Sequence, residues 1–387
     1  MSTTIIAAAE QLLTNRYNVP IRLIDVDQIS EEERRNRLLR ATVENPPPLL
    51  PSSLIIKQVV AEQYNPDDST SWDTRRFFQD WAGAQFLSGL PGDPGHGPHF
   101  YGGDRALGFI ILEDLGRDHR SLVEPLLHED AASAERALLK YITRLGQLHA
   151  DTIGRAAEFQ QLLHAANPAL AATSLHPSAE SLIQQFIERL ESLGIQQDDT
   201  LLAELQAVFA QMEQPGDFTA YIHADPCPDN IFYTGETLRL IDFEFGRFGH
   251  ALIDANYGRF PFPTCWCCNR LPNTLVTKLE NSYRAALVVG CPAAADDAQF
   301  YRALTAVSAY SLIISFSWLL TNALEKDSTW GIASVRARIL TWLEIFTATA
   351  TTHNELPATR GAAGRLLDLL QAHWPETDPL PLYPAFR

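Results

Sequence analysis

Apolar and polar positions alternate in different ways along the chain. Near the N-terminus, three short segments rich in branched aliphatic residues are separated by polar or proline-rich stretches, which predicts strands. They are residues 21–26, 36–44 and 52–60. Residues 74–90 then show helical periodicity, with large aromatic side chains on one broad face. A turn-rich connector follows, and another predicted strand pair ends in FIILEDLG, residues 109–116.

From about Ser121 the apolar spacing becomes helical, most clearly over residues 132–152. One predicted hairpin at 231–241, with a Gly235-Glu236 turn, interrupts the helices before they resume near residue 274. No internal repeat is evident. The predicted fold class is therefore α+β, with a strand-rich N-terminal lobe, residues 1–114, and a mostly helical C-terminal lobe, residues 115–387.

Residues 303–320 form an apolar stretch nearly long enough to span a bilayer. Its hydroxyl-bearing residues and its amphipathic neighbours favour a buried core helix over a membrane span. We therefore expect no membrane partner.

Composition and charge narrow the classes of function. A chain of 387 residues with 20% charged residues is typical of a globular protein. The net charge of −17 argues against nucleic acid as a partner and is compatible with a cationic small substrate. Five cysteines is an odd number, and the N-terminus meets Glu10 before a signal peptide can form, so a cytoplasmic location is expected.

The stretch 221–245 combines five carboxylates with a histidine and an asparagine. His223, Asp225 and Asn230 give the pattern HxDxxxxN, and Asp242 follows the predicted hairpin. Phosphoryl transfer requires metal to neutralise the phosphates and a carboxylate that takes the acceptor's proton. The spacing can supply a base and hard oxygen ligands for Mg²⁺.

HADPCPDN and LIDFEFGRFGHALIDAN resemble the HGDxxPxN loop and the IDxE segment of the aminoglycoside phosphotransferase and choline kinase superfamily, which has a kinase-like bilobal fold. The resemblance covers roughly residues 22–260. It implies that Asp225 is the catalytic base and that Asn230 and Asp242 bind Mg²⁺. It also implies that His223 and Asp254 support the catalytic loop structurally.

Weaker motifs occur in the order that the family requires. Lys57 ends an aliphatic predicted strand, as does the lysine that contacts ATP phosphates in kinases, although such a lysine is often only a solvated edge. Asp80 takes the place of a glutamate that pairs with that lysine, and a surface role for Asp80 is an alternative. FIILEDLG resembles the hinge, where backbone groups of Glu113, Asp114 and Leu115 would meet adenine.

The stretch at the position of the family's first loop, residues 27–41, departs from the family because it has no glycine and three consecutive glutamates. Asn36 resembles a residue that the family often has before its second strand. Positive charge for phosphate could come from Arg34, Arg35 or Arg37.

Other polar residues leave alternatives open. TCWCCN contains Cys265, Cys267 and Cys268, but no CxxC pair or second cluster completes a zinc site, so reduced, partly buried thiols are favoured over metal. Glu244 fits either a water-mediated metal contact or an outward-facing strand position. His149 fits a packing or capping role.

The sequence thus predicts a phosphotransferase that uses Mg²⁺ and ATP, with GTP as an alternative, on a hydroxyl of a small molecule of aminoglycoside, amino alcohol or sugar type. HAD and DFE in place of HRD and DFG argue against a protein kinase. One rival hypothesis is a pseudoenzyme that binds nucleotide or metabolite in a regulatory role. Another is an interaction scaffold built on the helices after residue 274. The oligomeric state stays open.

Overall fold

The protein is described by a computed structural model over residues 2–31, 34–60, 64–92, 94–170, 177–196, 199–234 and 237–387. The predicted Gly235-Glu236 turn and two of the three glutamates of the first loop, Glu32 and Glu33, lie outside the described residues.

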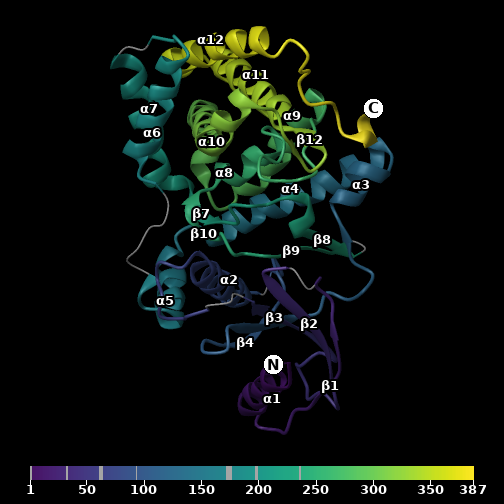
Figure 1. The fold of residues 1–387 in the computed structure, drawn as a ribbon. Helices are drawn as coiled ribbons and strands as arrows, with labels where there is room; N and C mark the ends of the chain where they lie inside the picture. The colour runs from purple at the N-terminus through teal and green to yellow at the C-terminus, as the bar shows by residue number, and fades with distance from the viewer. Residues whose placement is uncertain are drawn as a thin grey trace. The chain divides into compact units, whose positions relative to one another are not determined.

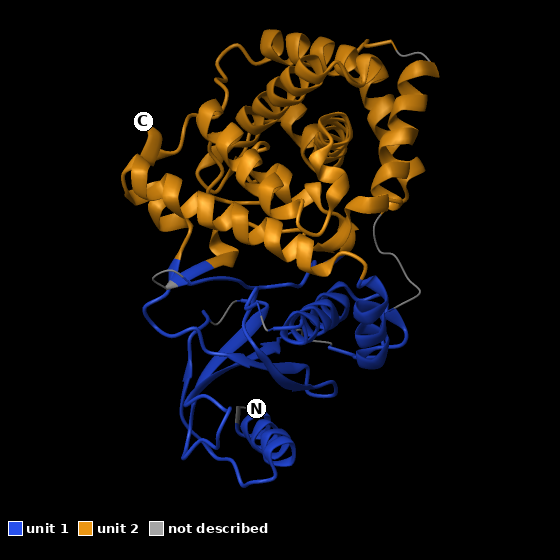
Figure 2. Ribbon diagram, turned by 180° about the vertical axis from the view of Figure 1, so that it is seen from behind, with its two compact units in different colours: residues 1–120, 155–175, 232–247 blue, residues 121–154, 176–231, 248–387 orange. Residues whose placement is uncertain are grey.

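The chain forms two compact units that are interleaved along the sequence (Figure 2). Unit 1 contains residues 1–120, 155–175 and 232–247, and unit 2 contains the remainder. The predicted boundary at 114/115 lies close to the end of the first segment of unit 1. Unit 1 also includes two later segments, residues 155–175 and 232–247, so its bounds differ from those of the predicted first lobe. The contiguous lobes 1–114 and 115–387 remain a prediction.

Unit 1 is built on a five-stranded antiparallel sheet with the strand order β1-β2-β3-β5-β4 (Figure 1). Its strands are β1 (Leu23–Gln28), β2 (Asn36–Val43), β3 (Ser53–Val59), β4 (Phe100–Asp104) and β5 (Phe109–Glu113). The three N-terminal segments predicted as strands correspond to β1, β2 and β3 within a few residues. The predicted aromatic helix is α2 (Trp72–Ser88), whose N-cap Ser71 accepts a hydrogen bond from the backbone N–H of Thr74.

Two helices of unit 1 were not predicted as elements of this unit. Helix α1 (Ser2–Tyr17) buries Ile5, Ala9 and Leu13 in the apolar core of the sheet. Helix α5 (Ala156–Ala166) packs on α2, with the Phe86 and Phe159 rings 5.9 Å apart. Part of the packing around α2 therefore comes from residues more than forty positions beyond the end of β5.

Near the unit boundary, β8 (Ile231–Thr234) and β9 (Thr237–Leu240) are neighbouring strands, as the predicted hairpin requires, and β6 (Arg120–Ser121) lies beside β8.

Unit 2 is mostly helical. Its α-helices are α3 (Val123–His128), α4 (Ala131–Thr152), α6 (Ala179–Ser192), α7 (Asp199–Glu213), α8 (Leu252–Ala255), α9 (Asn273–Leu287), α10 (Asp297–Glu325), α11 (Val335–His353) and α12 (Pro357–His373). Its short strands are β7 (Thr219–Ile222), β10 (Arg247–His250), β11 (Thr329–Trp330) and β12 (Ala333–Ser334). Short 3₁₀ helices cover Gly216–Phe218, Pro228–Asn230, Asn256–Gly258, Pro292–Ala295 and Pro384–Phe386. The predicted fold class, α+β with a strand-rich first part and a mostly helical second part, is confirmed.

Helix α10 contains the apolar stretch that could span a membrane by length and composition. Within unit 2 it packs against α6, α7 and α11, and 67% of its most apolar window is buried. The hydroxyls of Thr305 and Ser308 donate hydrogen bonds to carbonyls one turn earlier, at 2.8 and 2.9 Å. These features match the predicted core helix.

Candidate active site

In unit 1, Lys57 lies between two carboxylates. Its Nζ is 2.8 Å from Asp80 Oδ2 and 2.5 Å from Asp242 Oδ1. Lys57 was predicted to end its strand, but it lies inside β3, where Leu38 of β2 and Ile110 of β5 flank it. A lysine in a central strand with two carboxylate partners is not a solvated edge residue.

Burial of Lys57 alone would lower its pKa, but the charges of Asp242, Asp80 and Glu244 outweigh that effect and raise the pKa well above its usual value. Lys57 is therefore a fixed positive charge at any physiological pH. The Lys57 side chain is 13% exposed, whereas that of Asp242 is 32% exposed. Asp242 is thus the most solvent-exposed of the three charged side chains Lys57, Asp80 and Asp242.

Asp80 connects α2 to the segment that carries Asp242. Its second oxygen, Oδ1, accepts a hydrogen bond from the backbone N–H of Phe243 at 3.0 Å. Asp242 has a φ of 66°, a left-handed backbone that costs a non-glycine residue about 1–2 kcal/mol. The hydrogen bond to Asp80 helps to hold this turn. Asp80 is itself buried, so it does not lie at the surface.

Glu244 is also buried, and its carboxylate pairs with Arg76 of α2 and with Arg35 at 3.2 Å. The outward-facing strand position considered for Glu244 is therefore wrong. Burial, together with the nearby Asp242 charge, raises the pKa of Glu244 to about 7. Arg35, Asn36 and Glu244 line one small cavity with Lys57.

The other two arginines of the first loop have partners elsewhere in unit 1. Arg34 pairs with Glu31 at 3.1 Å, and Arg37 donates to Gln58 at 3.3 Å. Of the three arginines considered for phosphate, Arg35 is the one that lines the cavity beside Lys57.

The predicted hinge begins at the end of β5. The backbone N–H of Glu113 donates a hydrogen bond to the His99 carbonyl at 2.8 Å, so this N–H already has a partner within unit 1. The Asp114 carboxylate receives two hydrogen bonds from Arg40, at 2.7 and 3.0 Å, and one from Ser53 at 2.5 Å. These contacts fix the side chain of Asp114, and adenine recognition by the backbone of residues 113–115 stays a prediction.

In unit 2, the predicted catalytic loop folds tightly around Asp225. Thr264 Oγ1 donates to Asp225 Oδ1 at 2.5 Å, and Cys227 Sγ donates to the same oxygen at 3.1 Å. Asn230 Nδ2 donates to the Asp225 backbone carbonyl at 3.0 Å and lies 3.3 Å from Oδ2. Since the amide nitrogen of Asn230 faces Asp225, its amide oxygen points to the other side.

Asp254 holds the start of this loop through backbone groups. Its carboxylate accepts the His223 N–H at 2.6 Å and the Ala224 N–H at 2.9 Å. The buried His149 lies 3.3 Å from the same carboxylate and 2.7 Å from Tyr283 Oη. His223 Nδ1 in turn accepts the Asp225 N–H at 3.3 Å. His149 is thus a packed core residue, one of the two roles considered for it.

Sequence reasoning missed Thr264 and Tyr257. Tyr257 Oη donates to the Ala224 carbonyl at 3.2 Å and lies 3.1 Å from Thr264 Oγ1. Thr264 immediately precedes the CWCC run, but no spacing rule connects that run with Asp225, so only the fold reveals this contact. The predicted site residues therefore form two groups, one within each unit.

A comparison with protein families matches residues 105–287 to the phosphotransferase enzyme family, APH. The chain carries a phosphotransferase-family segment. The matched residues include the HADPCPDN loop and the IDFE segment, so the predicted resemblance and the enzyme class, a phosphotransferase, are confirmed. No curated protein matches the chain.

Solved structures with similar chains include a choline/ethanolamine kinase family protein from Mesorhizobium loti, which is 14% identical in sequence. The match covers 87% of the present chain and 92% of the other chain, with a TM-score of 0.44. A choline kinase from Cryptosporidium parvum Iowa II matches at 11% identity, 97% coverage of both chains and a TM-score of 0.48. The ternary complex of APH(2'')-IIa with streptomycin and ATP matches at 13% identity, 88% and 98% coverage, and a TM-score of 0.45.

Proposed function

We propose that this phosphotransferase moves the γ-phosphoryl group of ATP, or alternatively GTP, to a hydroxyl of a small molecule, with Mg²⁺ as cofactor. The observation that carries the proposal is the loop of unit 2 that holds Asp225 by hydrogen bonds. Unit 1 of the same chain holds Lys57 between Asp80 and Asp242.

The donor set fits a hard cation. Asp242 has a partly exposed carboxylate, whereas Asp80 is buried and committed to Lys57 and Phe243. Asn230 keeps its amide oxygen on the side away from Asp225. By the family resemblance, Asp242 and Asn230 would hold Mg²⁺, with carboxylate and amide oxygens as ligands. When bound, Mg²⁺ would neutralise charge on the phosphates.

Asp225 would accept the proton of the acceptor hydroxyl. Two donors, Thr264 and Cys227, fix Oδ1, and the Asn230 amide approaches Oδ2, so the orientation of the carboxylate is set before substrate binds. Asp254 and His223 would act on the loop backbone as positioning residues. Lys57 would contact the phosphates, with Asp80 holding its ammonium group in place.

The remaining parts of the proposal follow the family resemblance. Backbone groups of Glu113, Asp114 and Leu115 would meet the adenine ring, and the predicted lobes 1–114 and 115–387 would carry nucleotide and acceptor respectively. The net charge of −17 is compatible with a cationic acceptor in the cytoplasm. Amino alcohols, aminoglycosides and sugars are the acceptor classes to screen.

The experiment that tests the proposal is thermal unfolding with and without Mg²⁺ and ATP or GTP, in wild type and in Asp242→Ala. A ligand at a hundredfold excess over its dissociation constant stabilises the folded state by about 2.7 kcal/mol. We expect a Mg²⁺-dependent shift that Asp242→Ala loses and that the control Asp67→Ala keeps, since Asp67 is an exposed acid paired with Arg105.

A nucleotide shift in wild type without turnover of any acceptor or of ATP itself would favour the regulatory pseudoenzyme. Absence of a shift with both nucleotides would contradict the proposed nucleotide site.

A further inference from the structure

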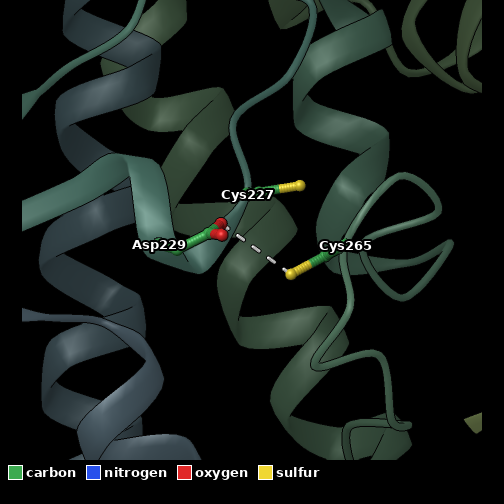
Figure 3. Close-up of side chains that lie close together, drawn as sticks. All are labelled: Cys227, Asp229 and Cys265. Carbon is green, nitrogen blue, oxygen red and sulfur yellow. Dashed lines mark hydrogen bonds between the residues drawn. The ribbon is translucent and has the colours of Figure 1, made fainter. Parts of the chain in front are cut away.

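Three possible metal ligands of unit 2 lie together beside the catalytic loop. The ligand atoms of Cys227, Asp229 and Cys265 are all within 4.8 Å of one another, and both thiols are buried. Figure 3 shows the carboxylate of Asp229 facing the sulfur of Cys265, at 3.9 Å. The second cluster that TCWCCN lacks in sequence is therefore supplied in space by the CPD segment of the catalytic loop.

A fourth donor is close to this group. Cys267 Sγ lies 3.0 Å from Cys265 Sγ, and Cys267 is also buried. Two thiolates on one tetrahedral zinc ion, each with a Zn–S distance of about 2.3 Å, stand about 3.8 Å apart. The sulfurs of Cys265 and Cys267 would have to separate by roughly 0.8 Å to reach this spacing.

The backbone on both sides of the cluster is fixed. Cys227 and Asp229 lie at a single 3₁₀ turn, where Asn230 N–H donates to the Cys227 carbonyl at 2.9 Å. Cys265 N–H donates to the Phe262 carbonyl at 2.9 Å. The indole N–H of Trp266 donates to Asp229 Oδ2 at 3.1 Å, which leaves Oδ1 as the oxygen nearer to Cys265. An outer hydrogen bond of this kind orients a metal-binding carboxylate.

A buried positive charge provides an independent observation. Arg338 is fully buried, and its Nη2 donates to the carbonyls of Cys265 and Trp330, at 2.9 and 2.8 Å. Its Nε and Nη1 have no hydrogen-bond partner within the described part of the chain. A buried guanidinium without a carboxylate is costly unless another negative group lies nearby. A divalent ion with two or three thiolates and a carboxylate carries net negative charge and would balance Arg338.

We infer that Cys227, Asp229 and Cys265, with Cys267 as fourth ligand, form a binding site for a thiophilic divalent cation of the zinc type. Each coordinating thiol releases its proton to solvent when the ion binds. The ligands differ from the oxygen set proposed for Mg²⁺, which prefers hard donors. The ion would fasten residues 264–267 to the catalytic loop, and it would replace the thiol hydrogen bond from Cys227 to Asp225, leaving Thr264 as the donor.

The test uses the full-length protein, reduced and stripped of metal, without nucleotide or acceptor, so its result does not depend on the proposed phosphotransfer. Zn²⁺ is added back, and the zinc that the protein retains after desalting is measured by elemental analysis. Co²⁺ is titrated as a spectroscopic probe, because thiolate ligands give a charge-transfer band in the near ultraviolet. We expect one ion per chain, and a band that excess Mg²⁺ does not remove.

Variants then locate the ligands. Cys227→Ser and Cys265→Ser should lose the band, and Asp229→Asn and Cys267→Ser should weaken binding at least tenfold. Cys268→Ser is the matched control, since its buried thiol donates instead to the Pro261 carbonyl at 2.8 Å. A second control, Cys291→Ser, changes a buried thiol that contacts the Asp217 carbonyl.

Asp229→Asn keeps the side-chain size, so it tests the site even where a cysteine variant does not fold. Failure of wild type to retain zinc or to give the cobalt band would overturn the inference. A band that survives unchanged in both Cys265→Ser and Asp229→Asn would overturn it as well.

Discussion

Asp80 Oδ2 lies 2.8 Å from Lys57 Nζ, although aspartate is one methylene shorter than the glutamate expected at this place. The pairing is possible in unit 1 because Asp80 is buried on α2 and its other oxygen is held by the Phe243 N–H. One short carboxylate thereby positions both the lysine and the turn of Asp242.

Replacing Asp80 by asparagine keeps the side-chain shape and the acceptor for Phe243 N–H but removes one charge beside Lys57. Because Asp242 still pairs with Lys57, we expect a loss of about 1–3 kcal/mol in the free energy of unfolding, and no more. The nucleotide-dependent thermal shift should also shrink, since Lys57 loses part of its orientation. Thermal unfolding with and without Mg²⁺ and nucleotide measures both effects.

The matched control for Asp80→Asn is Glu44→Gln, which also neutralises one acid of unit 1 but at an exposed position. It should leave stability and the nucleotide shift unchanged. Equal behaviour of the two variants would show that the Asp80–Lys57 pair does not contribute to nucleotide binding.

Most of the sheet of unit 1 could be predicted from sequence because strand segments such as 36–44 combine branched aliphatic residues with clear turn signals at both ends. Helix α5 could not be placed, since its packing on α2 joins residues far apart in the chain through a contact such as Phe86–Phe159. The interleaving of the units has the same origin, because local patterns do not report which distant segment covers a sheet.

The candidate site divides in a similar way. The pattern HxDxxxxN singled out Asp225 and Asn230, whose contacts with each other are local, and family order suggested Lys57 and Asp80. Thr264 escaped notice because a threonine has no distinctive spacing, and its 2.5 Å hydrogen bond to Asp225 depends on the fold of unit 2. The approach of Cys265 to Asp229 was missed for the same reason.

Asp225→Asn should abolish phosphoryl transfer while leaving the nucleotide-dependent thermal shift nearly intact. The amide cannot accept the proton, and loss of a general base typically costs about 10²–10⁴-fold in rate. Rates measured with an acceptor found by screening, together with the thermal shift of the same sample, separate chemistry from binding.

Asp368→Asn, a change of an exposed acid on α12, serves as the control for Asp225→Asn and should keep full turnover. Wild-type turnover in Asp225→Asn would show that another group takes the proton.

Ala224 occupies the place of the glycine in the family's HGD pattern and has a left-handed backbone, with a φ of 64°. This conformation costs a non-glycine residue about 1–2 kcal/mol, whereas glycine adds about 0.5–1 kcal/mol of backbone entropy cost. Ala224→Gly should therefore stabilise the protein by about 0.5 kcal/mol. Chemical denaturation checks this, with Ala220→Gly inside β7 as a control that should destabilise.

His250 is a buried neutral histidine of unit 2. Its ring stacks on Phe218 at 5.2 Å, and Nδ1 accepts the Leu252 N–H at 3.3 Å. Burial, with a smaller contribution from the charge of His149, lowers the pKa of His250 from 6.5 to about 3. The unfolded chain therefore binds a proton at His250 below pH 6.5 that the folded chain binds only near pH 3, so this residue makes stability fall as the pH falls through that window.

His250→Phe keeps a ring against Phe218 and removes the titrating group. We expect the stability of the variant to depend less on pH than that of wild type, by up to about 1.4 kcal/mol per pH unit below the unfolded pKa. Denaturation between about pH 5 and pH 7.5 measures the difference in slope. His128→Phe, at an exposed position, should retain the wild-type slope, and an unchanged slope in His250→Phe would show that His250 is not a source of acid sensitivity.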